Sequence, residues 1–435
     1  MTQDWCSPPL SGKGASSASC TPVGLSEGTL PVVKVLTIIH LYPPHHLGGY
    51  EVACQGVMER FVERGDEVLV LTNDYRIEGV EECGASVPVR RELAGWFNWE
   101  EWAPDRVGLA ERVRRERHNQ VTLRRVLAEF NPDVASVWDL AFMSWTLATI
   151  LERRRIPTVL TFLDQWVATS APFDAWTRIF DRRPWARPLG RALGLETRLP
   201  TFEGASASMA SAMIGATIEE ESRWKFPAAE LVPLGVDTAD FPVSSPRQGP
   251  WSWRVLYVGR VVPHKGVYTL VRSLPLLPEQ ARLELVGYVH DKQRQELLAL
   301  AEQLGVSDRV VFDVARSRQD LLGRYKRADV LVFPSEWPEP FGIVPLEAMA
   351  CGVPVVATGT GGSGEFLEDG ANCVLFAPGD PEALAAAVRR VAQDDELRRR
   401  ITQGGAATAS VLTMDRFADR LHELHRQALQ QDARG

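Results

Sequence analysis

The sequence predicts an α/β protein composed of two doubly wound, Rossmann-like domains that face each other across a cleft. Short apolar segments rich in β-branched residues alternate with longer amphipathic segments, a pattern typical of βαβ units and parallel sheets. The alternation begins a second time after a Pro- and Ser-rich connection at residues 241–250. The 435 residues suffice for two or three domains at roughly 150 residues each.

The first domain is expected to contain short buried strands, with a helix between the first two. Val52, Val57 and Phe61 are compatible with one helical face, and Gly65 stands where such a helix would end. The segments expected to form strands are 32–39, 67–72, 133–137, 157–161 and 211–215.

The second domain repeats the pattern. Val267, Leu270, Val271 and Leu274 form the apolar stripe of a helix that packs on a sheet, and Pro275 closes it. The expected strands are 254–258, 282–286, 309–313, 329–333 and 353–358.

These elements set the expected domain limits. Residues 1–30 are rich in Ser, Gly, Ala, Pro and Thr and have no hydrophobic period, so we expect a disordered tail. The first domain is placed at 31–240, the linker at 241–250 and the second domain at 251–412.

Composition and charge exclude several classes of protein. The balance of 48 basic and 56 acidic residues gives a net charge of −8, which argues against a nucleic-acid-binding surface. No apolar stretch approaches the roughly 20 residues of a membrane span, and the first thirty residues lack the features of a signal peptide. Six scattered cysteines, at 6, 20, 54, 83, 351 and 373, indicate reduced thiols and a cytoplasmic protein.

The most informative segment runs from Glu336 to Pro354. A strand ends at Phe333, and a short helix is expected to start at Pro345 and stop before Gly352. The free amides at its N-terminus suit a phosphate. Glu339 and Glu347, eight residues apart, suit hydrogen bonds from sugar hydroxyls. The alternative is a pair of solvated glutamates that favour a helix N-terminus.

In each domain the loop after the first strand also contains candidate ligand-binding residues. Gly259, Arg260 and Lys265 come after residues 254–258 and would place two cations over a diphosphate; the alternative is that both are surface cations. Gly48 and Gly49 open the first helix and would let the backbone approach a ligand, or else only supply the positive φ of a tight turn.

No metal site is expected from the residues. His45 and His46 lack a matching carboxylate or cysteine cluster. The chain also has no Asp-x-Asp motif to hold a divalent metal on a diphosphate. Cations and helix amides would therefore have to stabilise a diphosphate that leaves here.

Together these segments resemble the retaining glycosyltransferases of family 4, which have the two-domain GT-B fold. The resemblance covers nearly everything from about Val32 to Leu429 and is strongest in the second domain. The motifs occur in the family's order and spacing: Val258-Gly259-Arg260, Lys265-Gly266, Glu339-Pro340-Phe341-Gly342, Glu347 through Thr358, Gly361-Gly362 and Glu365.

The resemblance implies a nucleotide-sugar donor held mainly by the second domain, with no metal or other cofactor. Arg260 and Lys265 would bind the diphosphate, Glu339 the donor sugar's hydroxyls near the anomeric carbon, and Glu347 the ribose. Gly48 and Gly49 would approach the phosphates from the first, acceptor-side domain. The segment 413–435 would be a helix that crosses back onto that domain. The remaining donor contacts would come from Phe341, Gly342, Ile343, Val344 and Arg316.

One departure from the family affects the acceptor side. Many members have His-Asp where this chain has Leu163-Asp164. The roles of the family's histidine are therefore not transferred, whereas Asp164 still aligns and is expected to contact the acceptor. A smaller departure, Asn372-Cys373 where the family commonly has a glycine, is interpreted as a neutral loop change.

A basic, aromatic segment follows Asp164 and extends to Glu203. Its aromatic residues suit stacking on sugars, and its arginines suit an anionic acceptor or the inner membrane surface. The alternative is a packed insertion with a solvated basic face. The same ambiguity applies to Trp96, Phe97, Trp99 and Trp102. The residues of the segment are Trp166, Phe173, Trp176, Phe180, Trp185 and Phe202, interleaved with Arg178, Arg182, Arg183, Arg187, Arg191 and Arg198.

The function expected from the resemblance is hexosyl transfer, with retention, to a polysaccharide, lipid-linked or small-molecule acceptor. Two alternatives remain. A nucleotide-sugar 2-epimerase shares the architecture, but the intact Glu-x7-Glu motif disfavours it. A non-catalytic nucleotide-sugar-binding subunit is compatible with the missing histidine.

Overall fold

The computed structural model describes residues 32–82, 86–98, 103–170, 174–245, 249–315 and 317–432. Contacts divide the chain into Met1–Val32 and Val33–Gly435, and the second unit is described here. The expected disordered tail at 1–30 lies outside the described residues.

The first sheet has seven strands, all paired in parallel in the order β3-β2-β1-β6-β7-β8-β9. The order reverses at β1, because β2 pairs with one edge of this strand and β6 with the other. The strands are β1 (Lys34–Ile38), β2 (Glu67–Asn73), β3 (Val89–Leu93), β6 (Val134–Val137), β7 (Thr158–Phe162), β8 (Ser206–Met209) and β9 (Glu230–Leu231).

Helices connect most of these parallel strands, as is usual for parallel crossovers, but the described residues between β2 and β3 contain no helix. A small antiparallel pair, β4 (Phe97–Asn98) and β5 (Ala103–Pro104), stands apart from the main sheet. The helices are α1 (Gly49–Glu63), α2 (Leu109–Phe130), α3 (Thr146–Arg153), α4 (Trp166–Thr169), α5 (Thr177–Arg182), the 3-10 helix η2 (Pro184–Ala186), α6 (Arg187–Ala192) and α7 (Ala212–Glu221).

The second sheet is also parallel, in the order β12-β11-β10-β13-β14-β15, and reverses at β10. Its strands are β10 (Arg254–Val258), β11 (Arg282–Val286), β12 (Val310–Asp313), β13 (Val330–Phe333), β14 (Val355–Ala357) and β15 (Val374–Leu375). Its helices are η3 (Pro263–Lys265), α8 (Val267–Ser273), η4 (Leu274–Leu276), α9 (Asp291–Gln303), η5 (Ser307–Arg309), α10 (Arg318–Arg327), α11 (Ile343–Ala350), η6 (Gly362–Glu365), α12 (Pro381–Gln393) and α13 (Asp395–Val411).

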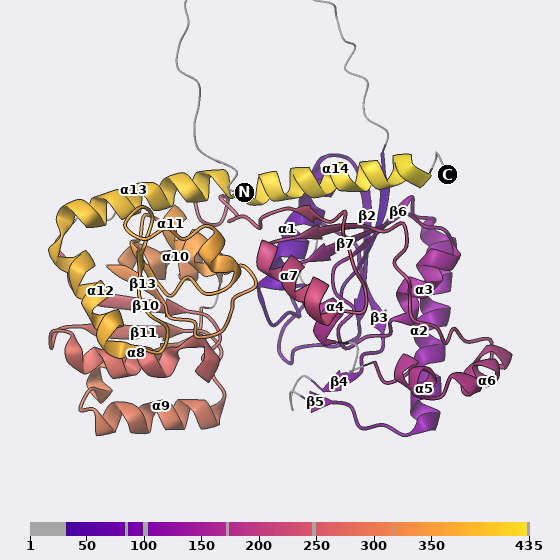
Figure 1. Ribbon diagram of the computed structural model, residues 1–435, viewed down its shortest axis with the longest axis horizontal. Helices are drawn as coiled ribbons and strands as arrows, with labels where there is room; N and C mark the ends of the chain where they lie inside the picture. The colour runs from indigo at the N-terminus through magenta and orange to yellow at the C-terminus, as the bar shows by residue number, and fades with distance from the viewer. Residues whose placement is uncertain are drawn as a thin grey trace, which may run out of the picture. The chain divides into compact units, whose positions relative to one another are not determined.

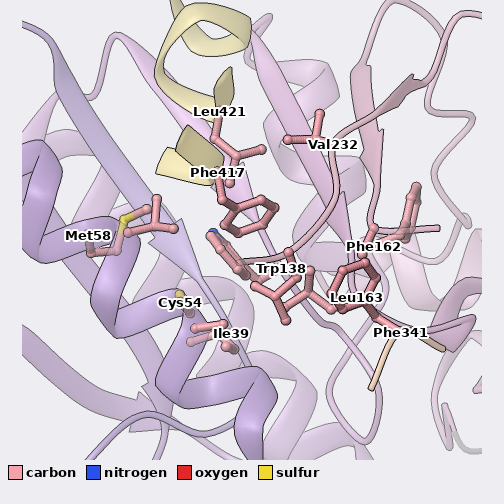
Figure 2. Packing of buried hydrophobic residues seen from close by; sticks show 14 of the residues in the cluster. Ile39, Cys54, Met58, Trp138, Phe162, Leu163, Val232, Phe341, Phe417 and Leu421 are labelled. Carbon is pink, nitrogen blue, oxygen red and sulfur yellow. The ribbon is translucent and has the colours of Figure 1, made fainter. Parts of the chain in front are cut away.

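The last helix, α14 (Met414–Asp432), follows the second sheet in sequence but contacts α1 and the strands β6, β7 and β8 of the first (Figure 1). Phe417 and Leu421 are buried in the core of that sheet, and the Phe417 ring meets the edge of Trp138 with centroids 6.3 Å apart (Figure 2).

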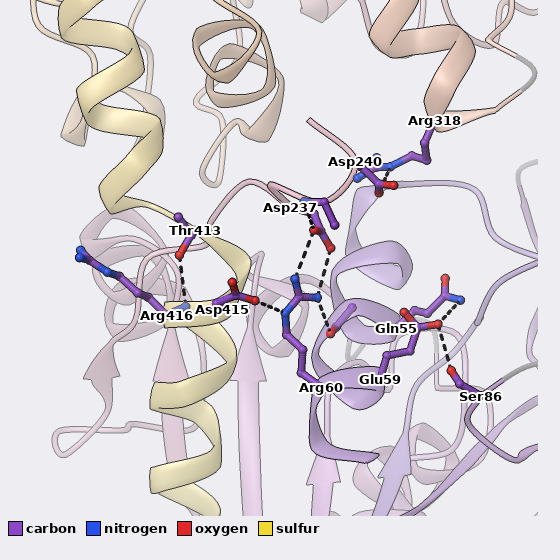
Figure 3. Close-up of polar contacts among 12 residues, drawn as sticks. Gln55, Glu59, Arg60, Ser86, Asp237, Asp240, Arg318, Thr413, Asp415 and Arg416 are labelled. Carbon is purple, nitrogen blue, oxygen red and sulfur yellow. Dashed lines mark hydrogen bonds and ion pairs between the residues drawn. The ribbon is translucent and has the colours of Figure 1, made fainter. Parts of the chain in front are cut away.

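The entry to α14 is held by backbone and ionic contacts. The amide of Val236 donates to the carbonyl of Leu412, and the amide of Met414 donates back to Val236, each at 2.9 Å. Arg60 of α1 binds Asp237 at 3.1 Å and Asp415 at 2.6 Å (Figure 3). The backbone at Gly235 lies so close that an added Cβ would stand 2.1 Å from the Thr413 carbonyl carbon.

Two expectations about elements are wrong. Residues 211–215 are not a strand: Ser211 caps α7 by accepting from the Ile214 amide at 3.2 Å, and the strand is β8, just before it. Helix α11 begins at Ile343, two residues before Pro345, because Gly342 forms its N-cap with a φ of +89°. Proline is tolerated in a first turn, where its missing N–H leaves no bond unmade.

Candidate functional site

A cavity of about 790 Å³ is lined by loops that follow the carboxyl ends of strands in both sheets, where ligands bind in open α/β sheets. Arg316 lies outside the described residues, and Glu347 does not line the cavity. The predicted site residues that do line it are Gly48, Gly49, Asp164, Gly259, Arg260, Lys265, Glu339, Phe341, Gly342, Ile343 and Val344.

The loop after β10 brings the two predicted cations to the cavity. The Tyr257 hydroxyl donates to the carbonyl of Arg260 at 2.7 Å and so fixes the turn. Gly266 ends η3 with a φ of +73°, and a Cβ there would lie 1.8 Å from the Pro334 carbonyl oxygen. Glycine is required at 266 because the loops after β10 and β13 pass in direct contact.

Lys265 and Glu339 form an ion pair on the side of the cavity that the second sheet provides. The Lys265 ammonium lies 2.7 Å from each carboxylate oxygen of Glu339. The Glu339 side chain is only 5% exposed and that of Lys265 20%, so the two charges neutralise each other in a largely buried place.

The backbone of two glycines, Gly361 and Gly362, packs directly against the loop that carries Glu339. A Cβ on Gly361 would stand 2.6 Å from the backbone of Glu339, and one on Gly362 would stand 2.1 Å from the carbonyl oxygen of Pro340. The Gly362 amide donates to Glu339 at 2.7 Å, and Ser211 donates to Pro340 at 2.5 Å. The Gly361-Gly362 pair therefore serves this close approach.

Helix α11 presents its N-terminus to the same cavity. Ile343 and Val344 line the cavity, and amides in a first turn have no intrahelical acceptor. The Phe341 ring just before the helix packs against Phe366, with centroids 5.2 Å apart. Amides and the positive end of a helix dipole suit an anionic ligand.

Glu347 lies behind the cavity wall. It accepts a hydrogen bond from the Tyr325 hydroxyl at 2.7 Å and pairs with Arg318 at 3.4 Å. Burial raises the pKa of Glu347, while Arg318 and Tyr325 lower it in part. Asp240 also binds Arg318, at 2.8 Å (Figure 3).

The first sheet contributes one ionisable residue from each of three neighbouring strands. His40, Asp139 and Asp164 each stand two residues beyond the end of β1, β6 and β7. His40 Nδ1 lies 2.9 Å from Asp139, and His40 Nε2 lies 3.0 Å from Glu51 of α1. All four residues line the cavity.

The charge states in this cluster follow from these contacts. Burial lowers the pKa of His40, but the Asp139 and Glu51 carboxylates outweigh it and raise the pKa to about 10. Burial, and next the Asp139 carboxylate, raises the pKa of Asp164 to about 7. His40 is therefore an imidazolium at neutral pH.

The comparisons with known proteins agree with this arrangement. The model of "Glycosyl transferases group 1" matches residues 248–408, and that of the "Glycosyl transferase 4-like domain" matches residues 48–199. A D-inositol 3-phosphate glycosyltransferase of Xylanimonas cellulosilytica is 34% identical over 262 residues, which cover 55% of this chain and 61% of that relative. The chain thus spans about three fifths of that relative's length.

The chain belongs to the family 4 glycosyltransferases. Solved structures show that its fold is GT-B, as predicted. A sucrose-phosphate synthase of Thermosynechococcus elongatus superposes with a TM-score of 0.67 at 21% identity, covering 92% of this chain and 100% of the other. The Anabaena protein HepE in complex with UDP-glucose does so with a TM-score of 0.63 at 20% identity, covering 90% and 98%.

In this family 4 chain the histidine position is occupied by an apolar residue. Leu163 is 7% exposed and belongs to the same buried cluster as Trp138, Phe162 and Phe341 (Figure 2). Of the family's His-Asp pair, this chain keeps only Asp164, whose carboxylate accepts a hydrogen bond from the Trp166 amide at 2.9 Å.

The basic, aromatic segment of the glycosyltransferase is mostly packed. Trp166, Trp176, Phe180 and Phe202 are buried, whereas Trp185 is 72% exposed. Trp96 is buried as well. Trp99, Trp102 and Phe173 lie outside the described residues. Most of these aromatics are therefore packed in the core, whereas Trp185 is exposed and the buried Trp166 also lines the cavity.

Sequence reasoning missed His40, Glu51 and Asp139. A usable signal existed: His40 and Asp139 each follow an expected strand closely, and the order of the strands reverses between them. Within the described ranges, no group of three or more His, Cys, Asp or Glu side chains is arranged to hold a metal ion. Nor is any helix of that part of the chain long and apolar enough to cross a membrane.

Proposed function

We propose that the protein is a retaining glycosyltransferase that moves a sugar from a nucleotide-sugar donor to a hydroxyl of a polysaccharide, lipid-linked or small-molecule acceptor. The observation that carries this proposal is one cavity lined by two cations, a helix N-terminus and a buried glutamate. The UDP-glucose named with HepE supports a nucleotide sugar as the donor.

The donor's diphosphate would meet Arg260, Lys265 and the first amides of α11. Lys265 would then bind phosphate oxygens in place of Glu339, since a diphosphate carries more negative charge than a carboxylate. Glu339, freed on one side, would accept hydrogen bonds from the donor sugar. Glu347, paired with Tyr325 and Arg318 behind the wall, would need a small rearrangement to reach a ribose.

Retention of configuration would come from attack on the face that the diphosphate leaves. The bond from the anomeric carbon to the phosphate oxygen breaks, the bond to the acceptor oxygen forms, and the phosphate oxygen takes the acceptor's proton. The two cations and the α11 amides would stabilise the departing charge without a metal ion. Positioning by the cavity supplies the rest of the rate.

The first experiment is a thermal-shift screen with UDP-glucose, GDP-mannose, ADP-glucose and dTDP-glucose. Binding of one class raises the melting temperature and identifies the base. NMR of the products then shows the anomeric configuration and reveals a new epimer if the enzyme is instead a 2-epimerase. Donor binding without transfer or hydrolysis across a broad acceptor panel would indicate a non-catalytic subunit.

Glu339→Gln is expected to reduce transfer by at least about 100-fold, or roughly 2.7 kcal/mol of transition-state stabilisation, with the fold retained. The matched control is Glu336→Gln, three residues away, whose carboxylate accepts from Thr269 at 2.6 Å and which does not line the cavity. Full activity in Glu339→Gln would refute the role assigned to Glu339.

We further infer that the enzyme works in the cytoplasm and touches the inner membrane face through residues 182–193. Trp185, Leu189 and Leu193 are 72%, 64% and 60% exposed. Trp185 lies in η2, Leu189 in α6 and Leu193 directly after α6, and a spacing of four residues favours one side of a helix. Exposed arginines at 182, 183 and 191 flank them, and apolar side chains beside cations suit an anionic bilayer surface.

A further inference from the structure

The two sides of the cavity differ in charge. Among the described lining residues, lysine and arginine occur only as Lys265 and Arg260, both in the loop after β10. The side formed by the first sheet instead has the carboxyl groups of Glu51, Asp139 and Asp164. The imidazolium of His40 faces these three carboxyl groups, and His46 also lines this side. One imidazolium does not balance three carboxyl groups, so this side remains acidic.

The acidic cluster is rigid. His40, Glu51 and Asp139 have side chains only 5–8% exposed and are joined by the two contacts of the His40 ring. The Tyr50 hydroxyl lies 2.5 Å and 2.7 Å from the carbonyl oxygens of Trp138 and Thr161 and so ties together the ends of β6 and β7. The cluster also stands where the strand order of the first sheet reverses, the usual ligand position in such sheets.

Besides His46 Nδ1, four buried polar atoms on this side have no hydrogen-bond partner in the part of the chain that the structure describes: Glu51 Oε2, Gln165 Oε1, Trp166 Nε1 and Ser170 Oγ. All four residues line the cavity. Buried polar atoms are normally satisfied, so these atoms call for a ligand. The first two only accept hydrogen bonds, the third only donates, and the serine hydroxyl does both.

Hydroxyl groups match this set of atoms, because each donates one hydrogen bond and accepts others. A fully ionised phosphate or a carboxylate only accepts, leaves Glu51 and Gln165 unmatched, and meets the negative charge of the cluster. We propose that this side of the cavity binds an uncharged, polyhydroxylated part of the acceptor, such as a neutral sugar or polyol, and rejects an acceptor that carries a phosphate there.

This inference rests on the proposed function and extends it to the class of acceptor. Asp164, Gln165, Trp166 and Ser170 would hold the hydroxyls. His40 acts through Glu51 and Asp139 and is a positioning residue. The family's histidine position is the apolar Leu163, so apart from Asp164 the polar contacts on this side come from residues that the family's motif does not assign.

The test measures binding by saturation-transfer NMR in the presence of the nucleoside diphosphate found by thermal shift. The probes are glucose with glucose 6-phosphate, and myo-inositol with myo-inositol 1-phosphate. The neutral member of at least one pair is expected to bind at least tenfold more tightly than its phosphate. Equal or tighter binding of both phosphates, or no binding by either neutral compound, would overturn the proposal.

Two variants assign the effect to these residues. Asp164→Asn keeps an oxygen that can accept from the Trp166 amide but removes a negative charge. It is therefore expected to reduce the ratio of the affinities for the neutral and the phosphorylated compound at pH 8. Ser170→Ala is expected to weaken neutral binding without changing the charge. Glu336→Gln, which removes a charge outside the cavity lining, should leave the preference unchanged. If Asp164→Asn and Glu336→Gln behave alike, the cluster does not set acceptor selectivity.

The thermal-shift result separates the two proposals. If no nucleotide sugar binds, the proposed function itself fails. If a nucleotide sugar binds and the neutral compounds do not, only the inference about the acceptor fails.

Discussion

Lys265 and Glu339 neutralise each other on the donor side of the cavity before a donor arrives. A largely buried cation without a partner is unfavourable, and the 2.7 Å contacts with Glu339 supply that partner. A diphosphate can replace the carboxylate at Lys265, which leaves Glu339 able to face the sugar. One residue pair thus links donor binding to the placement of the group proposed to hold the donor sugar.

Gly48 and Gly49 differ from the other site glycines, because the fold does not require them. Gly48 has an extended φ of −155°, and a Cβ on Gly49 would make ordinary contact with Ile343 at 3.9 Å. Gly49→Ala should therefore leave the melting temperature unchanged, yet raise the donor KM at least about tenfold, or roughly 1.4 kcal/mol, because the added methyl group blocks the phosphates.

The control for this substitution is Gly361→Ala. A Cβ there would stand 2.6 Å from the Glu339 backbone at a φ of +63°, so this variant should lose stability as well as activity. Measurement of the melting temperature and of donor kinetics on both variants distinguishes the two kinds of glycine. An unchanged donor KM in Gly49→Ala would show that this loop does not approach the donor.

Asp164 makes stability depend on pH. Its folded pKa is raised from 3.8 to about 7, so its contribution to stability is fully present below 3.8 and is lost as the pH rises through about 7. Asp164→Asn does not titrate, and its melting temperature relative to the wild type should rise from pH 5 to pH 8. The control variant is Asp308→Asn, which removes an exposed carboxylate outside the cavity. A rise of the same size in both variants would show that the effect is not specific to Asp164.

Motif spacing identified most of the donor-side residues but not their partners. Glu339 and Lys265 were expected to bind different parts of a donor, and nothing in their sequence separation of 74 residues indicates that they pair with each other. Glu347 was expected to face the ligand, whereas Tyr325 and Arg318 bind it behind the wall. Such pairings depend on how loops from different strands meet, which local sequence does not encode.

At the scale of elements, η2 and α6 offer a surface that can be tested separately from catalysis. Trp185→Ser combined with Leu189→Ser should reduce co-sedimentation with phosphatidylglycerol vesicles severalfold, because apolar contact adds about 25 cal/mol per Å² buried. Binding should also fall as salt is increased, since it depends in part on arginines. Neutral phosphatidylcholine vesicles should bind the wild type poorly.

Leu298→Ser is the control variant for this experiment. Leu298 is 41% exposed on α9, a helix between β11 and β12 of the second sheet. Its vesicle binding should equal that of the wild type. Equal loss in both variants would point to general surface hydrophobicity instead of a membrane-binding segment.

Elements with a strong pattern were predicted well, and small ones were not. The strands at 254–258 and 282–286 match β10 and β11 in full, because each is a short segment with several large apolar residues and is followed directly by a glycine. Strand β8 has the sequence Ser-Ala-Ser-Met, which shows no apolar run. The neighbouring Ser-Ala-Met-Ile-Gly at 211–215 has more apolar residues and so predicts a strand, although a serine before an apolar run is also a helix N-cap signal.

At the scale of the whole molecule, α14 connects the stability of the two sheets. Phe417, 2% exposed, packs against Trp138 beneath the helix. Phe417→Ala should lower the free energy of unfolding by about 3–5 kcal/mol, the cost of the lost burial and of the cavity left behind. Because α14 is the last helix and continues from the second sheet, its release weakens the link between the halves as well.

Calorimetry can distinguish a local effect from this wider one. The wild type is expected to unfold in a transition shared by both sheets, whereas Phe417→Ala should show a lower, broader transition or two resolved ones. Leu300, a partly buried residue of α9 on the second sheet, gives the comparison variant Leu300→Ala, which leaves α14 in place. If Phe417→Ala keeps one sharp transition at a reduced temperature, then α14 stabilises the first sheet without coupling it to the second.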